Sequence, residues 1–292
     1  MSAVLSEAPR VGASKRRVTF KKVLDNVGVR ILLIVMSILF LIPLYWTVVT
    51  ALKQDQELAV YPPTLIPHVW AWENFSKALD IMPYGTYFMN SVLITGLNII
   101  GALISGMLVA YGFACINWPG RDKVFYVVLA TIFLPTPITL IPLFDMFASL
   151  GWVNTYLPLV VPAFFGSSFN VFLLRQFLLQ IPREMMEAAR IDGANELQIL
   201  FRVVFPMARP ALAVVAILVG IGVWNDFMGP LIYIQDDSLR PLAIGLQFFQ
   251  SAHDIQYNLL MAASLMVLVP VIIFFLFFQR HFIKGVVVGS IK

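Results

Sequence analysis

The sequence predicts an all-α integral membrane protein with six transmembrane helices. Sixty per cent of its 292 residues are hydrophobic and only 12% are charged, whereas an ordinary soluble domain has about 25% charged residues. Several stretches run for roughly 20 residues or more with few charges, which is the length that a helix needs to cross a bilayer. A soluble core would not bury this much apolar surface, so lipid must solvate part of the chain.

Six apolar stretches account for the predicted spans. The first is too long for the core of a signal peptide, and no small-residue cleavage site follows it, so we expect it to remain as an anchor. The third contains Pro135, Pro137 and Pro142, which interrupt helical hydrogen bonding. The predicted spans cover about residues 29–52, 86–117, 124–150, 158–180, 210–234 and 257–279.

The domain organisation is correspondingly simple. Residues 1–28 form a polar, basic tail, residues 29–280 form one membrane domain, and residues 281–292 form a second tail. The external segment 53–85 contains Trp70 and Trp72, and we expect it to lie along the membrane interface, where tryptophans gather. A polar loop, residues 181–209, separates the fourth span from the fifth, and a second external loop covers residues 235–256.

The positive charges orient this map. Of the 20 Lys and Arg residues, only Lys53, Lys77 and Arg240 fall in segments opposite to the two termini. Short cytoplasmic loops carry the excess of Lys and Arg in membrane proteins. Both termini are therefore predicted to be cytoplasmic, and residues 181–209 lie on the same side.

The loop 181–209 reads as two short helices joined by a turn. Pro182 suits the first turn of a helix, where its missing N–H costs nothing. Gly193 suits a helix stop, because glycine adopts positive φ without strain. A second helix is expected from about Asn195 to Val204. Pro206 would end it, and Pro210 would open the next membrane span.

The first of these helices is more apolar than a free cytoplasmic loop should be. It carries Met185, Met186, Ala188 and Ala189, and flexible or small apolar side chains on an exposed helix suit docking into a groove of another protein. Packing beneath its own membrane domain would explain the same residues. The residues by themselves leave these two interpretations open.

The same loop resembles the EAA loop of ABC importer permeases. The match comprises Glu187-Ala188-Ala189, Asp192-Gly193-Ala194, Phe201 and Pro206 at the spacing of that family. The resemblance extends over about residues 29–292 and is strongest to the carbohydrate-uptake branch, particularly the smaller permease subunit of maltose-type transporters. The further motifs that carry it are Asn90-Ser91, Leu134-Pro135, Leu173-Leu174-Arg175-Gln176-Phe177, Trp224-Asn225-Asp226-Phe227 and Gln279-Arg280.

This resemblance implies a role for each loop residue. Glu187 would pair with a basic group of a separate ATPase, Ala188 and Ala189 would allow close approach, and Asp192 would brace the turn at Gly193. It also implies the partners: a second homologous permease, an ATPase dimer that binds ATP and Mg, and an extracytoplasmic solute-binding protein. The implied setting is the cell membrane of a bacterium or archaeon, and the implied cargo is a sugar or sugar-like solute.

Polar residues within the spans are candidates for the pathway, because burying them in lipid is costly. Asn225 and Asp226 are the clearest, and Asn98 and Asn170 are weaker. For Asp226 we favour a clamp between helices over a contact with the solute, since its motif recurs in permeases with different substrates. For Asn98 and Asn170, pathway lining and amide bonds between helices remain equally open.

Other classes of function have little support. The chain has one cysteine, Cys115, and its three histidines show no metal spacing, so we expect no metal site and no catalytic residues. The net charge of +4 does not indicate nucleic acid. There is no phosphate-binding loop motif, so this chain is not expected to bind a nucleotide. An ion-gradient-driven transporter or channel is the alternative, but it would leave the EAA-like loop without a role.

Overall fold

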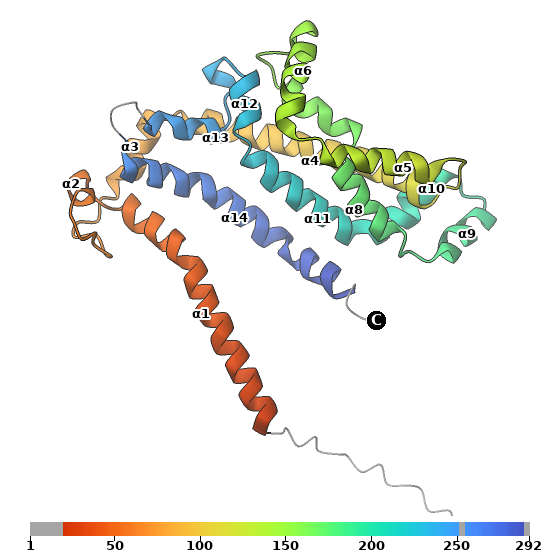
Figure 1. Cartoon of the computed structure of the whole chain (residues 1–292), viewed down its shortest axis with the longest axis horizontal. Coiled ribbons are helices and arrows are strands. Elements are labelled where there is room, and N and C mark those ends of the chain that lie inside the picture. Colours follow the sequence, from red (N-terminus) through yellow and green to blue (C-terminus); the bar gives the residue numbers. More distant parts are fainter. Residues whose placement is uncertain (1–19, 251–254, 289–292) are drawn as a thin grey trace, which may run out of the picture.

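The computed structural model describes residues 20–250 and 255–288, and the regular elements in this part of the chain are helices. Figure 1 shows them as an elongated bundle. The helices are α1 (Phe20–Ala51), α2 (Asp55–Leu58), α3 (Glu73–Ile81), α4 (Tyr84–Ala114), α5 (Arg121–Ala130), α6 (Thr136–Ser149), α7 (Leu157–Val160), α8 (Ser168–Leu178), α9 (Arg183–Ile191), α10 (Glu196–Ile199), α11 (Phe205–Trp224), α12 (Met228–Tyr233), α13 (Leu242–Gly245) and α14 (Tyr257–Val288), with 3-10 turns η1 (Thr131–Phe133), η2 (Val161–Phe165), η4 (Asp237–Leu239) and η5 (Leu246–Phe249) and a π-helical turn η3 (Leu200–Val204).

Helices α4, α8, α11 and α14 form the packed body. Helix α11 lies against the other three, and α4 also packs along α8. We call the end that carries α9 and α10 the bracket end, and the end that carries α2, α3 and α13 the loop end. One apolar cluster, around Leu174, Leu200 and Val204, fills the bracket end. Another, around Tyr87 and Leu242, fills the loop end.

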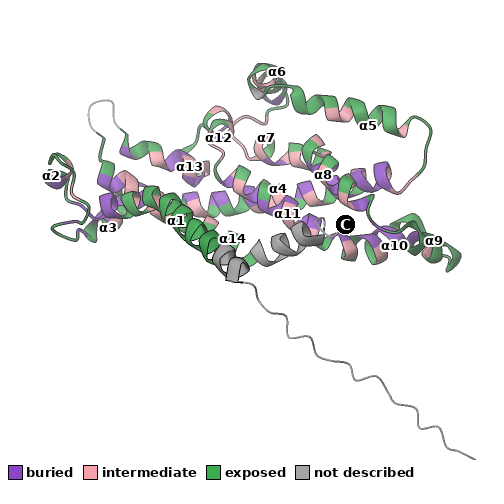
Figure 2. Cartoon of the chain, turned by 60° about the horizontal axis from the view of Figure 1, so that its bottom comes forward, coloured by how far each residue is buried: buried purple, intermediate pink, exposed green. Residues whose placement is uncertain are grey.

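Helix α1 leaves this body and stands apart from it. Every side chain from Val27 to Pro43 is exposed, and continuous burial begins only at Val49, where α1 meets α14. Figure 2 shows α1 exposed along almost its whole visible length. The helix begins at Phe20, within the predicted tail 1–28, and residues 1–19 lie outside the described part of the chain.

Five helical segments are long and apolar enough to cross a membrane, and a bent pair brings the number to six among the described residues. The third predicted span, 124–150, is interrupted near its prolines, as the sequence predicts, and its two helices α5 and α6 meet at an angle of 100°. Leu134 and Pro135 are extended between them, with ψ of 113° and 133°. A residue before proline is disfavoured in the helical region, so Pro135 breaks the helix here.

The fifth span also differs from its predicted limits of 210–234. A continuous helical segment runs from Glu196 to Trp224, so Pro206 and Pro210 do not separate two helices. The π-helical turn η3 lies directly before Pro206 and widens the backbone, as such turns do where a helix must accommodate an irregularity. The helix then stops at Trp224, ten residues earlier than expected, and the chain resumes as the short helix α12.

The sixth predicted span is present and longer than expected. Helix α14 begins at Tyr257 and continues to Val288, through most of the predicted tail 281–292. The external loop 235–256 is only partly a surface loop. Leu242, Ile244 and Phe249 within it are buried against the loop end of the bundle, while residues 251–254 lie outside the described residues.

Candidate functional site: the bracket and the break in α11

The loop 181–209 contains a compact bracket, defined here as α9, its turn and α10. Gly193 has a φ of +82°, as the sequence predicts. The Ala194 N–H donates to Ala189 O at 2.9 Å and the Gly193 N–H donates to Arg190 O at 3.0 Å. This pair of bonds is a Schellman motif, which satisfies the last carbonyls of a helix and requires a left-handed residue at this position. Gly193 therefore sets the direction in which the chain leaves α9.

The second helix of the bracket begins with a capping box that the sequence analysis did not identify. The Asn195 side chain accepts from the Gln198 N–H at 2.9 Å, and the Gln198 side chain accepts from the Asn195 N–H at 2.9 Å. An Asn-x-x-Gln pair ahead of an apolar run is a known start signal for a helix. It would have placed the start of α10 from the sequence alone.

An ion pair closes the bracket and joins it to the bundle. The Arg190 Nε donates to Glu196 Oε1 at 2.9 Å across the turn. The Tyr111 hydroxyl on α4 donates to the other carboxylate oxygen of Glu196. This carboxylate thus ties α9, α10 and α4 together, through a tyrosine 85 residues away in the sequence, a separation that local patterns do not reveal.

The two faces of α9 have different environments. Met186 is buried and packs in the apolar cluster of the bracket end, with Ala189 beside it. Glu187 and Ala188 are exposed on the opposite face, and Ile191 is 86% exposed. Both interpretations left open by the sequence therefore have a physical basis, because one face packs beneath the membrane domain and the other is uncovered.

Asp192 does not brace the turn at Gly193 through its side chain, as the resemblance had implied. It is the exposed residue at the end of α9, and its carboxylate forms no hydrogen bond with another described residue. The turn is held instead by the Schellman bonds and by the pair of Arg190 with Glu196.

The Trp224-Asn225-Asp226-Phe227 motif forms the break between α11 and α12. The Trp224 indole donates from Nε1 to Val267 O on α14 at 3.2 Å. The Asn225 side chain donates to Ile221 O at 2.8 Å and so caps the last turn of α11. One carboxylate oxygen of Asp226 accepts from the Gly229 N–H at 3.2 Å and caps the start of α12. The Asp226 side chain thus satisfies a backbone N–H at the start of α12, while the Asn225 side chain adds a second donor to the Ile221 carbonyl, which the Asn225 backbone N–H also reaches at 3.2 Å.

The break lies deep in the membrane domain. Val267, which accepts from Trp224, is near the middle of the 21-residue candidate span Tyr257–Phe277. Asn225 is exposed at this depth and Asp226 is half-buried. An exposed amide and a half-buried carboxylate at mid-depth suit a water-filled pathway or a polar contact with another subunit, because lipid would not solvate them.

Helix α4 supplies hydrogen bonds to the irregular segments around it. Asn98 Nδ2 donates to Leu159 O at 3.0 Å, and Ser105 Oγ donates to Ala163 O at 2.9 Å. Asn90 Nδ2 donates to the carbonyl of Arg240 at 2.9 Å. Backbone polar groups at membrane depth must be satisfied within the protein. For Asn98 the structure therefore shows a hydrogen bond between two segments of the chain. The seven-residue spacing of Ser91, Asn98 and Ser105 could have indicated from the sequence that one face of α4 is polar.

Asn170 lies on α8 where that helix faces α4. Its side chain is buried, and its Cβ lies close to Gly106, within ordinary contact distance of a side chain built there. It thus belongs to the contact between α4 and α8. The structure does not bring it together with Asn225 and Asp226, which lie at the break.

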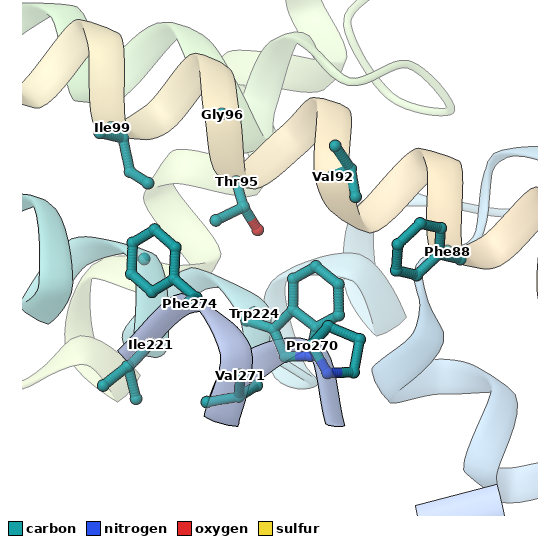
Figure 3. Close-up of a pocket in the computed structure, with 11 residues that line it drawn as sticks. Phe88, Val92, Thr95, Gly96, Ile99, Ile221, Trp224, Pro270, Val271 and Phe274 are labelled. Atoms are coloured by element: carbon teal, nitrogen blue, oxygen red, sulfur yellow. The ribbon is translucent and has the colours of Figure 1, made fainter. Parts of the chain in front are cut away.

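Several cavities adjoin the break, and two of the larger ones differ in character. An apolar pocket of about 270 Å³ lies between α4, α11 and α14 (Figure 3). The Thr95 hydroxyl points into it and has no hydrogen-bond partner among the described residues. One hydroxyl among aromatic and aliphatic side chains does not match the many polar groups of a sugar, so we assign no solute to this pocket.

The second cavity is larger and more polar. It has a volume of about 340 Å³, and it lies between the break and the segment that contains α13 and η5. Trp224 and Phe227 provide aromatic surface, and Asn225, Gln247 and Gln250 provide amides. Sequence analysis identified Asn225 but missed the two glutamines, because they lie in a segment that appeared to be a surface loop.

Comparison with known proteins agrees with this architecture. Residues 102–288 match the family described as binding-protein-dependent transport system inner membrane component. The chain is 36% identical to the arabinooligosaccharides transport system permease protein AraQ of Halalkalibacterium halodurans, over 86% of this chain and 90% of the relative. It is 33% identical to the diacetylchitobiose uptake system permease protein NgcG of Streptomyces coelicolor, over 89% and 87% of the two chains.

A third relative and a solved structure extend the comparison. The chain is 30% identical to the sn-glycerol-3-phosphate transport system permease protein UgpE of Yersinia pestis, over 88% of this chain and 94% of the relative. Its fold is similar to a chain of a bacterial ABC transporter involved in the import of the acidic polysaccharide alginate. That match has a TM-score of 0.78 at 22% identity and covers 90% of this chain and 98% of the other. This chain therefore belongs to the family of binding-protein-dependent transport system inner membrane components, the multi-pass permeases of ABC importers.

Proposed function

We propose that this permease carries a sugar or sugar-like solute, and that its bracket transmits the motion of a separate ATPase to the membrane helices. The named solutes of its relatives are arabino-oligosaccharides, diacetylchitobiose and sn-glycerol-3-phosphate. These molecules share several hydroxyl or other polar groups on a small carbon frame. These similarities support the class of solute and do not single out one member of it.

The polar cavity beside the break is the best candidate for contact with such a solute. Aromatic faces stack on the C–H surface of a sugar ring, and amides can both donate to and accept from its hydroxyls. The amides of Gln247 and Gln250 form no hydrogen bond with another described residue. A passing solute would find these groups free, and Asn225 beside them at mid-depth.

The uncovered face of α9 is the observation that carries the coupling proposal. Glu187 and Ala188 face outward, whereas Met186 on the other face is buried in the same cluster as residues of α11. A push on the outer face would thus reach α11 through packed side chains, and α11 ends at the polar break. Interconversion of two such packed arrangements is a common means of transmitting a local contact.

The remaining partners follow from the same proposal. The chain contains no phosphate-binding loop motif, so ATP and Mg would bind on an ATPase dimer. A second homologous permease would complete the pathway, and the uncovered surface of α1 offers it, together with lipid, an extensive apolar contact. A solute-binding protein would deliver the cargo on the side opposite to the bracket. Both termini would be cytoplasmic.

The decisive experiment compares two exposed glutamates in the reconstituted complex. Glu187→Ala removes the outward charge of α9, while Glu73→Ala removes an exposed glutamate on α3 at the loop end. Losing one charged contact in a protein interface costs roughly 2–5 kcal/mol when the contact is buried, so ATP-driven uptake should fall by about tenfold or more in Glu187→Ala. Uptake by Glu73→Ala should be unchanged.

Two outcomes would contradict the proposal. Unchanged uptake and ATPase activity in Glu187→Ala would remove the bracket as the coupling element. Uptake that requires an ion gradient and ignores ATP would instead favour a secondary transporter. Assembly of the complex is monitored by size-exclusion chromatography, so that loss of folding is not mistaken for loss of coupling.

A further inference from the structure

Residues 59–72, which we call the finger, form an exposed apolar segment between α2 and α3. The finger reads Ala-Val-Tyr-Pro-Pro-Thr-Leu-Ile-Pro-His-Val-Trp-Ala-Trp and contains no Asp, Glu, Lys or Arg. Tyr61 is 92% exposed, and Leu65, Ile66 and Trp72 are each more than 60% exposed. A run of large apolar side chains on the surface of one loop marks a site of interaction with a partner or a membrane.

The finger folds back along the membrane-spanning part of α1. The Tyr45 hydroxyl donates to Leu65 O at 2.6 Å, and Tyr45 lies six residues before the end of α1 at Ala51, which is about 9 Å along the helix axis. The middle of the finger is therefore held beside a turn of α1 that belongs to the candidate span Val27–Ala51. A loop that projected straight into water could not make this contact.

Some polar groups of the finger are hydrogen-bonded to Lys53 and Glu57, which lie beneath it. Lys53 is 2% exposed and donates from Nζ to Thr64 O. Glu57 is 8% exposed and accepts from Thr64 Oγ1 at 2.6 Å and from the His68 N–H at 3.2 Å. Three further positions are prolines and have no N–H. These hydrogen bonds are made on the inner side of the finger, while large apolar side chains such as Tyr61, Leu65 and Ile66 are exposed on its outer surface.

The position of the finger indicates lipid as the occupant. In Figures 1 and 2 it lies at the periphery, at the opposite end of the molecule from α9. Stacked rings of Trp70, Trp72 and Phe75 continue it toward α3. Tryptophan and tyrosine gather where a membrane meets water, and a surface without Asp, Glu, Lys or Arg lacks the polar rim that a docked soluble protein contacts.

We propose that the finger inserts into the interfacial region of the lipid leaflet at the loop end and fixes the height of α1 and α3 in the membrane. Its depth would be that of interfacial apolar segments, about 5–10 Å below the headgroup boundary. Because the finger has no Asp, Glu, Lys or Arg, a neutral phosphatidylcholine leaflet should accept it. The proposal does not depend on the identity of the transported solute or on coupling through the bracket.

Depth-dependent fluorescence quenching tests this proposal on the full transporter in phosphatidylcholine vesicles. A single environment-sensitive label is attached at Leu65→Cys or Ile66→Cys in a Cys115→Ala background. Quenching by nitroxides carried near the headgroup end of the lipid chain should exceed quenching by deeper nitroxides and by aqueous iodide. A label at Ser76→Cys on α3 is the aqueous control, and one at Phe40→Cys on α1 is the deep control.

Three results would overturn the proposal. A finger label that is quenched like the Ser76 control would place the finger in water. Protection from iodide that appears only after a loaded solute-binding protein is added would make that protein the occupant. Protection from both iodide and all lipid nitroxides would indicate a contact with another membrane subunit. Wild-type ATPase activity of each labelled variant would confirm that the complex is intact.

Discussion

The side-chain amide of Asn98 on α4 donates a 3.0 Å hydrogen bond to the backbone carbonyl of Leu159, 61 residues later in the chain. Leu159 belongs to α7, a helix of only four residues that leads into a 3-10 turn. Such short elements leave carbonyls without helical partners. A side chain from a continuous neighbouring helix therefore allows a broken segment to lie within the membrane domain.

Asn98→Ala should destabilise the protein without changing its surface charge. Bonds between membrane helices contribute about 0.6 kcal/mol on average and up to about 1.7 kcal/mol, and we expect a loss toward the upper value because the Leu159 carbonyl would lose this partner. Thermal unfolding in detergent measures the effect. Ser37→Ala is the matched control, since Ser37 bonds only to Leu33 O in its own helix. Equal melting temperatures for both variants would refute this role of Asn98.

Met185 and Met186 provide a pair of adjacent methionines with different environments. Met186 is 4% exposed within the apolar cluster of the bracket end, whereas Met185 is 44% exposed. Truncation of a buried methionine to alanine costs about 2–5 kcal/mol. Met186→Ala should lower the melting temperature clearly and Met185→Ala should not. The reverse order would mean that the inner face of α9 has been assigned wrongly.

Gly193 should tolerate asparagine better than valine. Its φ of +82° is strained for any residue with a Cβ, but no other atom lies within 4 Å of a Cβ built there. Asparagine enters the left-handed region more readily than β-branched residues do. Gly193→Val should therefore lose transport and stability, and Gly193→Asn should retain more of both. Gly112→Ala, at an open site that is not left-handed, serves as the control.

Lowering the pH should destabilise the contacts beneath the finger, because the Glu57 carboxylate becomes protonated. Burial alone would raise the pKa of this carboxyl, but hydrogen bonds from Thr64 and the His68 N–H, with the charges of His68 and Lys53, hold it below its ordinary value. A lowered folded-state pKa contributes stability above the unfolded pKa, and this stability is lost as the pH falls through the folded pKa.

Glu57→Gln should accordingly reduce the melting temperature at pH 7 and flatten its decline between about pH 5 and pH 3. The control is Glu73→Gln, because Glu73 is exposed and its carboxylate pairs with the Lys77 ammonium at 3.7 Å. Melting curves recorded across this range provide the measurement. A decline in Glu57→Gln as steep as that of the unmodified protein would show that Glu57 is not the responsible group.

Single-cysteine labelling in a Cys115→Ala background tests the orientation. Glu184 on α9 and Ser238 in η4 are both exposed and lie at opposite ends of the membrane domain. A thiol reagent that does not cross membranes should label Ser238→Cys in whole cells and label Glu184→Cys only after permeabilisation. Labelling of Glu184→Cys in intact cells would reverse the assigned topology.

The sequence by itself determined the class of the protein, most of its spans and the turn of the bracket. Apolar stretches of about 20 residues and the uneven distribution of Lys and Arg can be read without a structure. The bilayer selects for them, because its core excludes charged residues and short cytoplasmic loops carry the positive excess. Gly193 was equally predictable, because the need for a left-handed residue is set by the local chain. The Asn195–Gln198 capping box was also local and could have been identified.

Only the tertiary structure decided where the fifth span breaks and which polar groups meet. The sequence suggested that Pro206 divides two helices, yet the helix continues through it, whereas the predicted span 210–234 breaks after Trp224. Breaks within a membrane are permitted where distant side chains satisfy the freed backbone groups. The bonds from Trp224 to Val267 and from Asn98 to Leu159 span 43 and 61 residues. Their partners are fixed by the packing of helices, which no local pattern encodes.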